Sequence, residues 1–193
     1  MIRLNCMRAF DDLENGPVAL VSAARKLKSQ GYKRVILAGQ SFGAFISLIA
    51  ANASDDVDAI IATVPAAYPP MDAWIQFNAL KLYSLLERTR RARVMLFYFQ
   101  NDEFDPGGRA SRSDEILTEH GVPHLIIDRP TGLTSHWAAS TDKFAAEYAA
   151  CVAAFAADDA AKGSLDCPTL ERRAWLTRKA TNPPAPGGSG APG

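Results

Sequence analysis

The 193-residue sequence lacks a long apolar run, and no stretch approaches the roughly 18–20 apolar residues that a membrane-spanning helix requires. It also lacks net charge, because 21 basic residues balance 21 acidic residues. We therefore expect no membrane span and no field that attracts nucleic acid. The first residues hold no apolar segment of the signal-peptide type, so the chain as written predicts no export signal.

Cysteine is scarce, and the three cysteines, Cys6, Cys151 and Cys167, match no metal-binding spacing. Cys151 and Cys167 are close enough in sequence to bridge across a turn, which would indicate an oxidising compartment. Two unpaired buried thiols are the alternative. The compartment stays open: cytoplasmic if Met1 is the native start, and periplasmic or secreted if the native protein begins upstream.

Five short segments read as strands, because each is rich in branched or aromatic residues and is bounded by turn residues. They are residues 2–6, 34–38, 57–64, 93–99 and 124–128. Most are nearly continuous in hydrophobicity, which is typical of strands covered on both faces. Helical patterns separate them, at residues 17–30, 42–53, 71–91 and 109–120, and a last helix is expected at 140–156.

Strands alternating with helices predict an α/β fold with a mostly parallel sheet of about five strands flanked by helices. We expect this core to occupy residues 1–160. Residues 161–180 are expected to form a C-terminal extension. Residues 181–193 are rich in proline and glycine and are expected to be disordered.

The motif Gly39-Gln40-Ser41-Phe42-Gly43 stands between the predicted strand 34–38 and the predicted helix 42–53. A chain that turns from strand to helix within one residue forces that residue, Ser41, to a strained positive φ. Glycines on either side let the two backbones approach closely. The motif therefore predicts a serine hydroxyl at the carboxyl edge of the sheet, with the Phe42 N–H placed to meet a developing oxyanion.

This strand–turn–helix motif resembles the nucleophile elbow of the α/β-hydrolase superfamily. The resemblance implies a catalytic acid and then a histidine, each following a later strand. Asp102 fits the acid, since it follows the strand 93–99 and precedes Pro106 by four residues. Asp105 is the second candidate and Glu103 the third, and a solvated acidic turn is the alternative interpretation.

The resemblance also points to His136 as the base, because it lies in the loop after the last predicted strand. Of the other two histidines, His120 ends a predicted helix and His124 begins the last strand, at the wrong edge of the sheet. With Ser41, Asp102 and His136 the implied activity is cleavage of a carboxylic ester or related acyl bond through an acyl-enzyme. The implied substrate is a small acyl molecule, and no metal or cofactor is required.

An aromatic-rich crossover at residues 65–77 follows the strand 57–64. It leaves the sheet at the same edge as Ser41, so Tyr68 and Trp74 are candidates for the wall of an acyl pocket. The alternative is an ordinary helix that packs into the core.

The resemblance covers only part of the superfamily's fold. A single predicted strand and a single helix precede the elbow, and the family's third strand, whose following loop supplies a second oxyanion N–H, has no counterpart. We expect either truncation upstream of Met1 or a shortened variant. A non-catalytic binding protein or inactive fragment, and an acyltransferase using the same serine, are the alternative functions. The sequence leaves the oligomeric state open.

Overall fold

The computed structural model describes residues 12–68, 72–105, 107–157 and 167. The predicted strand at 2–6 and the predicted tail at 181–193 lie outside the described residues, and so does the predicted extension at 161–180 apart from Cys167.

Four parallel strands form the sheet, in the spatial order β1-β2-β3-β4. They are β1 (Ile36–Gln40), β2 (Ala59–Thr63), β3 (Arg93–Tyr98) and β4 (His124–Asp128). Because all four run the same way, their carboxyl ends lie along one edge, where the loops that follow them can meet. The expected α/β class with a parallel sheet is confirmed.

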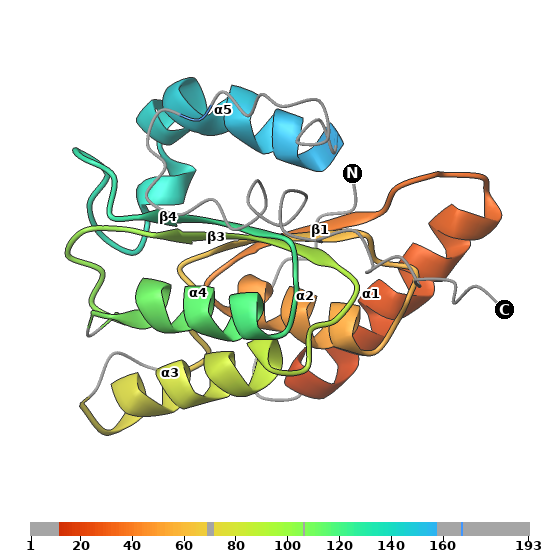
Figure 1. Cartoon of the computed structure of the whole chain (residues 1–193), viewed down its shortest axis with the longest axis horizontal. Coiled ribbons are helices and arrows are strands. Elements are labelled where there is room, and N and C mark those ends of the chain that lie inside the picture. The colour runs from red at the N-terminus through yellow and green to blue at the C-terminus, as the bar shows by residue number, and fades with distance from the viewer. Residues whose placement is uncertain (1–11, 69–71, 106, 158–166, 168–193) are drawn as a thin grey trace, which may run out of the picture.

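Helices cover both faces of this sheet (Figure 1). On one face lie α1 (Asp12–Ser29), α2 (Phe42–Asn52), α3 (Asp72–Leu86) and α4 (Arg109–Glu119), and on the other lies α5 (Asp142–Ala157), after a short 3-10 turn at Ala138–Ser140. Alternate residues along the strands contribute to two apolar cores, one on each face of the sheet. Leu96 and Ile126 face the four-helix side, whereas Phe97 and Ile127 face α5.

Most predicted boundaries agree with the structure to within two residues, and β4 agrees at both ends. The start of α1 was predicted wrongly: the helix begins at Asp12 and continues through Pro17. Pro17 lacks an N–H, so it removes one intrahelical hydrogen bond, yet in the second turn this does not end the helix. The end of α3 was also placed too late, because the chain leaves the helix at Leu86.

The expectation of strands covered on both faces holds for β2 and β3, whose residues are all buried. It fails for β1, in which Ala38 is exposed and Ile36 is half-buried. Within the described residues β1 is an edge strand, with β2 as its neighbour.

A disulfide joins Cys151 of α5 to Cys167, with the two Cα atoms 4.8 Å apart. Both cysteines lie in the core on the α5 side, beside Tyr148 and Phe155. Of the two alternatives left open by the sequence, the bridge is therefore the one that the structure contains. No helix among the described residues has the length and apolar character needed to cross a membrane.

Candidate active site

Ser41 occupies the single residue between β1 and α2 and has φ 54° and ψ −118°. Its N–H donates to the Thr63 carbonyl at 2.9 Å, which fixes the turn to the end of β2. The positive φ expected from the strand-to-helix turn is thus present at Ser41.

The two glycines of the motif have different roles. A Cβ on Gly39 would lie 2.3 Å from the carbonyl carbon and oxygen of Gly43, so strand and helix backbones meet there as expected. A Cβ on Gly43 would meet no neighbouring atom within 4 Å. The expectation that glycine on either side serves the close approach therefore holds for Gly39 and is wrong for Gly43, where an added Cβ would point into open space.

Phe42 is the first residue of α2, so its N–H is one of the helix-start donors that have no intrahelical acceptor. In the part of the chain that the structure describes, no hydrogen bond uses this N–H. The donor therefore remains free at the turn that carries the Ser41 hydroxyl.

Asp102 and His136 are joined by a buried hydrogen bond of 2.9 Å between Oδ1 and Nδ1. A carboxylate can only accept, so the imidazole carries its proton on Nδ1. The Phe104 N–H donates to the same oxygen at 3.0 Å. His136 Nε2 is buried and has no partner, so no hydrogen bond to Ser41 Oγ is present. This unpaired acceptor is the atom that a general base would use.

The other two acid candidates lie differently. Asp105 is paired with two cations, with its Oδ1 3.1 Å from Arg109 Nε and its Oδ2 3.7 Å from Arg129 Nη2. Glu103 is exposed. Of the three acidic residues in this loop, Asp102 is the one bonded to the histidine.

Two aromatic rings flank the His136 imidazole. The Phe104 ring lies over it at 4.2 Å between centroids, and the Trp137 ring meets it edge-on at 5.6 Å. Trp137 is 64% exposed, so it stands at the surface next to the buried imidazole. Sequence reasoning did not single out either ring.

The Gln40 side chain connects the elbow to the histidine loop. Its Nε2 donates to the His136 carbonyl at 2.8 Å, and its Oε1 accepts from the Ser140 hydroxyl at 3.0 Å. Because Gln40 directly precedes Ser41, this contact brings the elbow and the histidine loop together.

Backbone strain gathers at the carboxyl edge of the sheet. The non-glycine residues with positive φ in the described ranges all follow strand ends or belong to the histidine loop: Ser41, Val64, Asn101, Arg129 and Ser135. Such conformations are costly and cluster at functional sites. Their common location marks this edge independently of the motif.

The remaining histidines lie elsewhere, as expected. His124 begins β4 at the opposite edge and is buried, with Nδ1 bonded to the Val122 carbonyl and Nε2 to Asp114. His120 follows the last residue of α4.

The predicted acyl-pocket residues form an aromatic cluster at the start of α3. Tyr68 and Trp74 are stacked at 5.1 Å, and Phe77 packs against both rings. Trp74 is 38% and Phe77 55% exposed, so these two side chains do not pack into the core. The buried Asn78 fixes this turn, since its Oδ1 accepts from the N–H groups of Ala67 and Tyr68.

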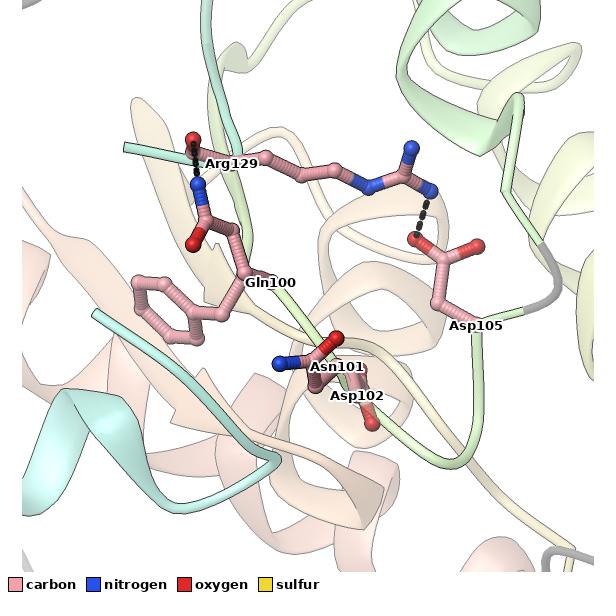
Figure 2. Close-up of a pocket in the computed structure, with 6 residues that line it drawn as sticks. Gln100, Asn101, Asp102, Asp105 and Arg129 are labelled. Atoms are coloured by element: carbon pink, nitrogen blue, oxygen red, sulfur yellow. Dashed lines mark hydrogen bonds and ion pairs between the residues drawn. The ribbon is translucent and has the colours of Figure 1, made fainter. Parts of the chain in front are cut away.

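A cavity of about 360 Å³ opens beside the Asp102 loop (Figure 2). It is lined by Phe99, Gln100, Asn101, Asp102, Asp105 and Arg129. Its lining is mainly polar side chains from the loop after β3, and neither Tyr68 nor Trp74 belongs to it. Within the described ranges, no three His, Cys, Asp or Glu side chains gather as a metal site.

Known proteins resemble this chain in fold and not in sequence. No family model and no curated protein matches the sequence. A solved puromycin-hydrolysing peptidase from Mycobacterium tuberculosis is similar, at 18% identity and a TM-score of 0.52, over 78% of this chain and 26% of that one. The likeness is one of fold.

An acylaminoacyl peptidase from Pyrococcus horikoshii also aligns, at 15% identity and a TM-score of 0.49, over 67% of this chain and 24% of its own. This chain thus spans about a quarter of the length of each solved protein.

Proposed function

We propose that the protein is a serine hydrolase of the α/β-hydrolase superfamily that cleaves a carboxylic ester or related acyl bond. Ser41 is the nucleophile, His136 the general base and Asp102 the acid that orients it. The observation that carries the proposal is the buried Asp102–His136 hydrogen bond, which leaves Nε2 buried and unpaired. The strained φ of Ser41 and the Gln40–His136 contact support it.

In the proposed reaction His136 Nε2 takes the proton from Ser41 Oγ as that oxygen attacks the acyl carbonyl carbon. The Phe42 N–H donates to the resulting oxyanion. The proton on Nε2 passes to the leaving alcohol or amine as its bond to carbon breaks, which leaves an acyl ester on Ser41. A water molecule, deprotonated by His136, then attacks this ester. The bond between the acyl carbon and Ser41 Oγ breaks, Oγ takes the proton back from Nε2, and the carboxylic acid leaves.

The missing hydrogen bond between Ser41 and His136 is compatible with this role. Catalytic hydrogen bonds are often long before substrate binds and tighten in the complex. An unpaired buried nitrogen is otherwise costly, because it loses its contact with water and gains no partner. A substrate that excludes water and brings the serine hydroxyl to Nε2 would remove that cost.

The test is covalent labelling by a fluorophosphonate, which reacts with activated serines. We expect the folded protein to be labelled at Ser41, with labelling abolished by Ser41→Ala and reduced on the order of 10³-fold or more by His136→Ala. Ser29→Ala and His120→Ala are the matched controls, since these residues lie at the ends of helices. Both controls are expected to label at the wild-type rate.

A folded wild-type protein that is not labelled would contradict the proposal and would favour a binding protein on the same scaffold. If labelling succeeds, acyl transfer is tested separately with protein that has not been exposed to the probe. Adding an alcohol or amine acceptor to a p-nitrophenyl ester assay would divert product from the free acid to the new ester or amide. Hydrolysis predicts that the free acid remains the main product.

A further inference from the structure

Arg109 is the largest fully buried side chain in the described part of the molecule. Burial of a guanidinium costs several kcal/mol unless it is paired. Arg109 is also the first residue of α4, where the positive end of the helix dipole disfavours a cation. Burial and the helix dipole therefore both disfavour the charge of Arg109, and the partners of the guanidinium must compensate for both effects.

The partners of Arg109 come from the loop that carries the candidate acid. Nη2 lies 3.6 Å from Asp102 Oδ2 and Nε lies 3.1 Å from Asp105 Oδ1, although neither contact has hydrogen-bond geometry. Nη1 donates to the Pro65 carbonyl at 2.6 Å. The guanidinium is thus fixed between Pro65, which follows β2, and the loop that carries Asp102 and Asp105.

The face of the guanidinium rests on Tyr98, with its central carbon 5.4 Å from the ring centroid. Burial raises the pKa of Tyr98, so this residue stays a neutral phenol, and its hydroxyl is bonded to Ser113 at 2.9 Å. Tyr98 therefore offers Arg109 a ring face and not a third anion. The charge of Arg109 is directed at the two carboxylates.

The two carboxylates depend on Arg109 to different degrees. Asp105 has a second cation, because Arg129 reaches it from the surface (Figure 2). In the described residues the ion pairs of Asp102 are with Arg109 and His136 alone. Asp102 Oδ2 is buried without a hydrogen bond, so Arg109 is the group that faces this oxygen.

We propose that Arg109 is a positioning residue for the reaction: its guanidinium holds the Asp102 carboxylate in the orientation in which Oδ1 accepts the hydrogen bond from His136 Nδ1–H. This inference rests on the proposed function. Arg109 acts through Asp102 and does not touch the reacting atoms. Its removal would leave Asp102 as a buried anion without a compensating cation, which is strongly unfavourable.

The experiment is a double-mutant cycle of Arg109→Lys and Asp102→Asn, read out as the fluorophosphonate labelling rate of Ser41. Lysine keeps the charge but loses the planar fork that holds a carboxylate in one orientation. We expect Arg109→Lys alone to slow labelling roughly tenfold or more, since small displacements of catalytic groups are costly. In the Asp102→Asn background the same change is expected to alter the rate less than twofold, because the group it positions is gone.

Ester hydrolysis supplies a second readout. A residue that positions the acid lowers kcat, and we expect KM for a p-nitrophenyl ester to stay within about twofold. Arg112→Lys is the matched control, because Arg112 lies on the same helix, is exposed and pairs with Glu115. It is expected to leave both the rate and the stability unchanged.

Equal effects of Arg109→Lys in both backgrounds, or no effect in the wild-type background, would overturn the inference and leave the proposed function intact. An unlabelled wild-type protein would instead be a failure of the proposed function. If Arg109→Lys does not unfold cooperatively, the Arg109 Nη–H resonances, which belong to the group nearest Asp102, are compared between wild type and Asp102→Asn. A shift supports the coupling, and an unchanged resonance overturns it.

Discussion

The Gln40 side chain donates a hydrogen bond to the backbone carbonyl of His136, at 2.8 Å and across 96 residues of sequence. Its other end accepts from Ser140, so both atoms of the amide are used by the histidine loop. The residue before the candidate nucleophile thereby sets the place of the loop that holds the candidate base.

We predict that Gln40→Ala slows labelling of Ser41 roughly tenfold, because His136 would lose the contact that fixes its backbone. Two lost hydrogen bonds should also lower the free energy of unfolding by about 1–3 kcal/mol. The labelling rate and a denaturant titration measure the two effects. Gln30→Ala, at an exposed position just after α1, is the control and should change neither.

Gln40→Ala labelled at the wild-type rate would show that the loop is held by other contacts. A variant that loses stability but keeps its rate would show that the bond serves the fold alone. Gln40→Glu separates the effects of the two hydrogen bonds, since a carboxylate can accept from the Ser140 hydroxyl but cannot donate to the His136 carbonyl. It is expected to label at least as slowly as Gln40→Ala.

The sequence predicted the four strands of the described residues and the strained turn well, because these depend on local properties. Branched apolar runs bounded by turn residues identified β4 at both ends, and the Gly-x-Ser-x-Gly spacing placed the positive φ on Ser41. The Asp102–His136 pairing was expected from chain order and family resemblance. The structure joins these two side chains by a hydrogen bond, although their catalytic roles remain a proposal.

The contacts that sequence reasoning missed are long-range. Gln40 occupies a position of the motif that accepts any residue, so nothing nearby reveals its bond to a loop 96 residues later. Arg109 follows two glycines at a helix start, where a cation is unfavourable, and this was a signal that could have been read. Its partners, however, become evident only when the loops after β2 and β3 meet.

The two glycines of the elbow should respond differently to alanine. Gly39→Ala would place a Cβ 2.3 Å from the Gly43 carbonyl, a clash with backbone that cannot move away, so we expect a loss of about 3 kcal/mol or more. Gly43→Ala has open space and lies in α2, where alanine is favoured over glycine by up to about 1 kcal/mol. Thermal unfolding of the pair measures the difference. Equal losses would contradict the backbone contact.

The Cys151–Cys167 disulfide closes a loop with a sequence separation of 16 residues. A loop of about this length is expected to contribute roughly 3 kcal/mol by restricting the unfolded chain. We therefore predict a lower melting temperature for the double variant Cys151→Ala/Cys167→Ala, and for wild type in reducing agent. Cys6→Ala keeps the bridge and should retain the response to reductant. Identical melting curves with and without reductant would contradict a stabilising bridge.

The aromatic cluster at the start of α3 leads to a prediction about specificity. Tyr68 and Trp74 are stacked, and Asn78 fixes the Tyr68 backbone, so the two rings present a preformed apolar surface. If this surface is the acyl-pocket wall, Trp74→Ala should raise KM for a long-chain p-nitrophenyl ester by roughly three- to tenfold, the value of one aromatic contact. The acetyl ester, which has no long acyl chain for the ring to contact, should keep its KM.

Leu80→Ala is the matched control for this test. Leu80 lies on the same helix, six residues after Trp74, and is 63% exposed, so its removal also deletes exposed apolar surface. A proportional rise in KM for both esters with Trp74→Ala would indicate a general disturbance of the site. An unchanged KM for the long ester would show that Tyr68 and Trp74 do not form the binding surface. The acyl chain would then lie elsewhere along the carboxyl edge of the sheet. The next side chain to replace would be Trp137, which is exposed and contacts His136.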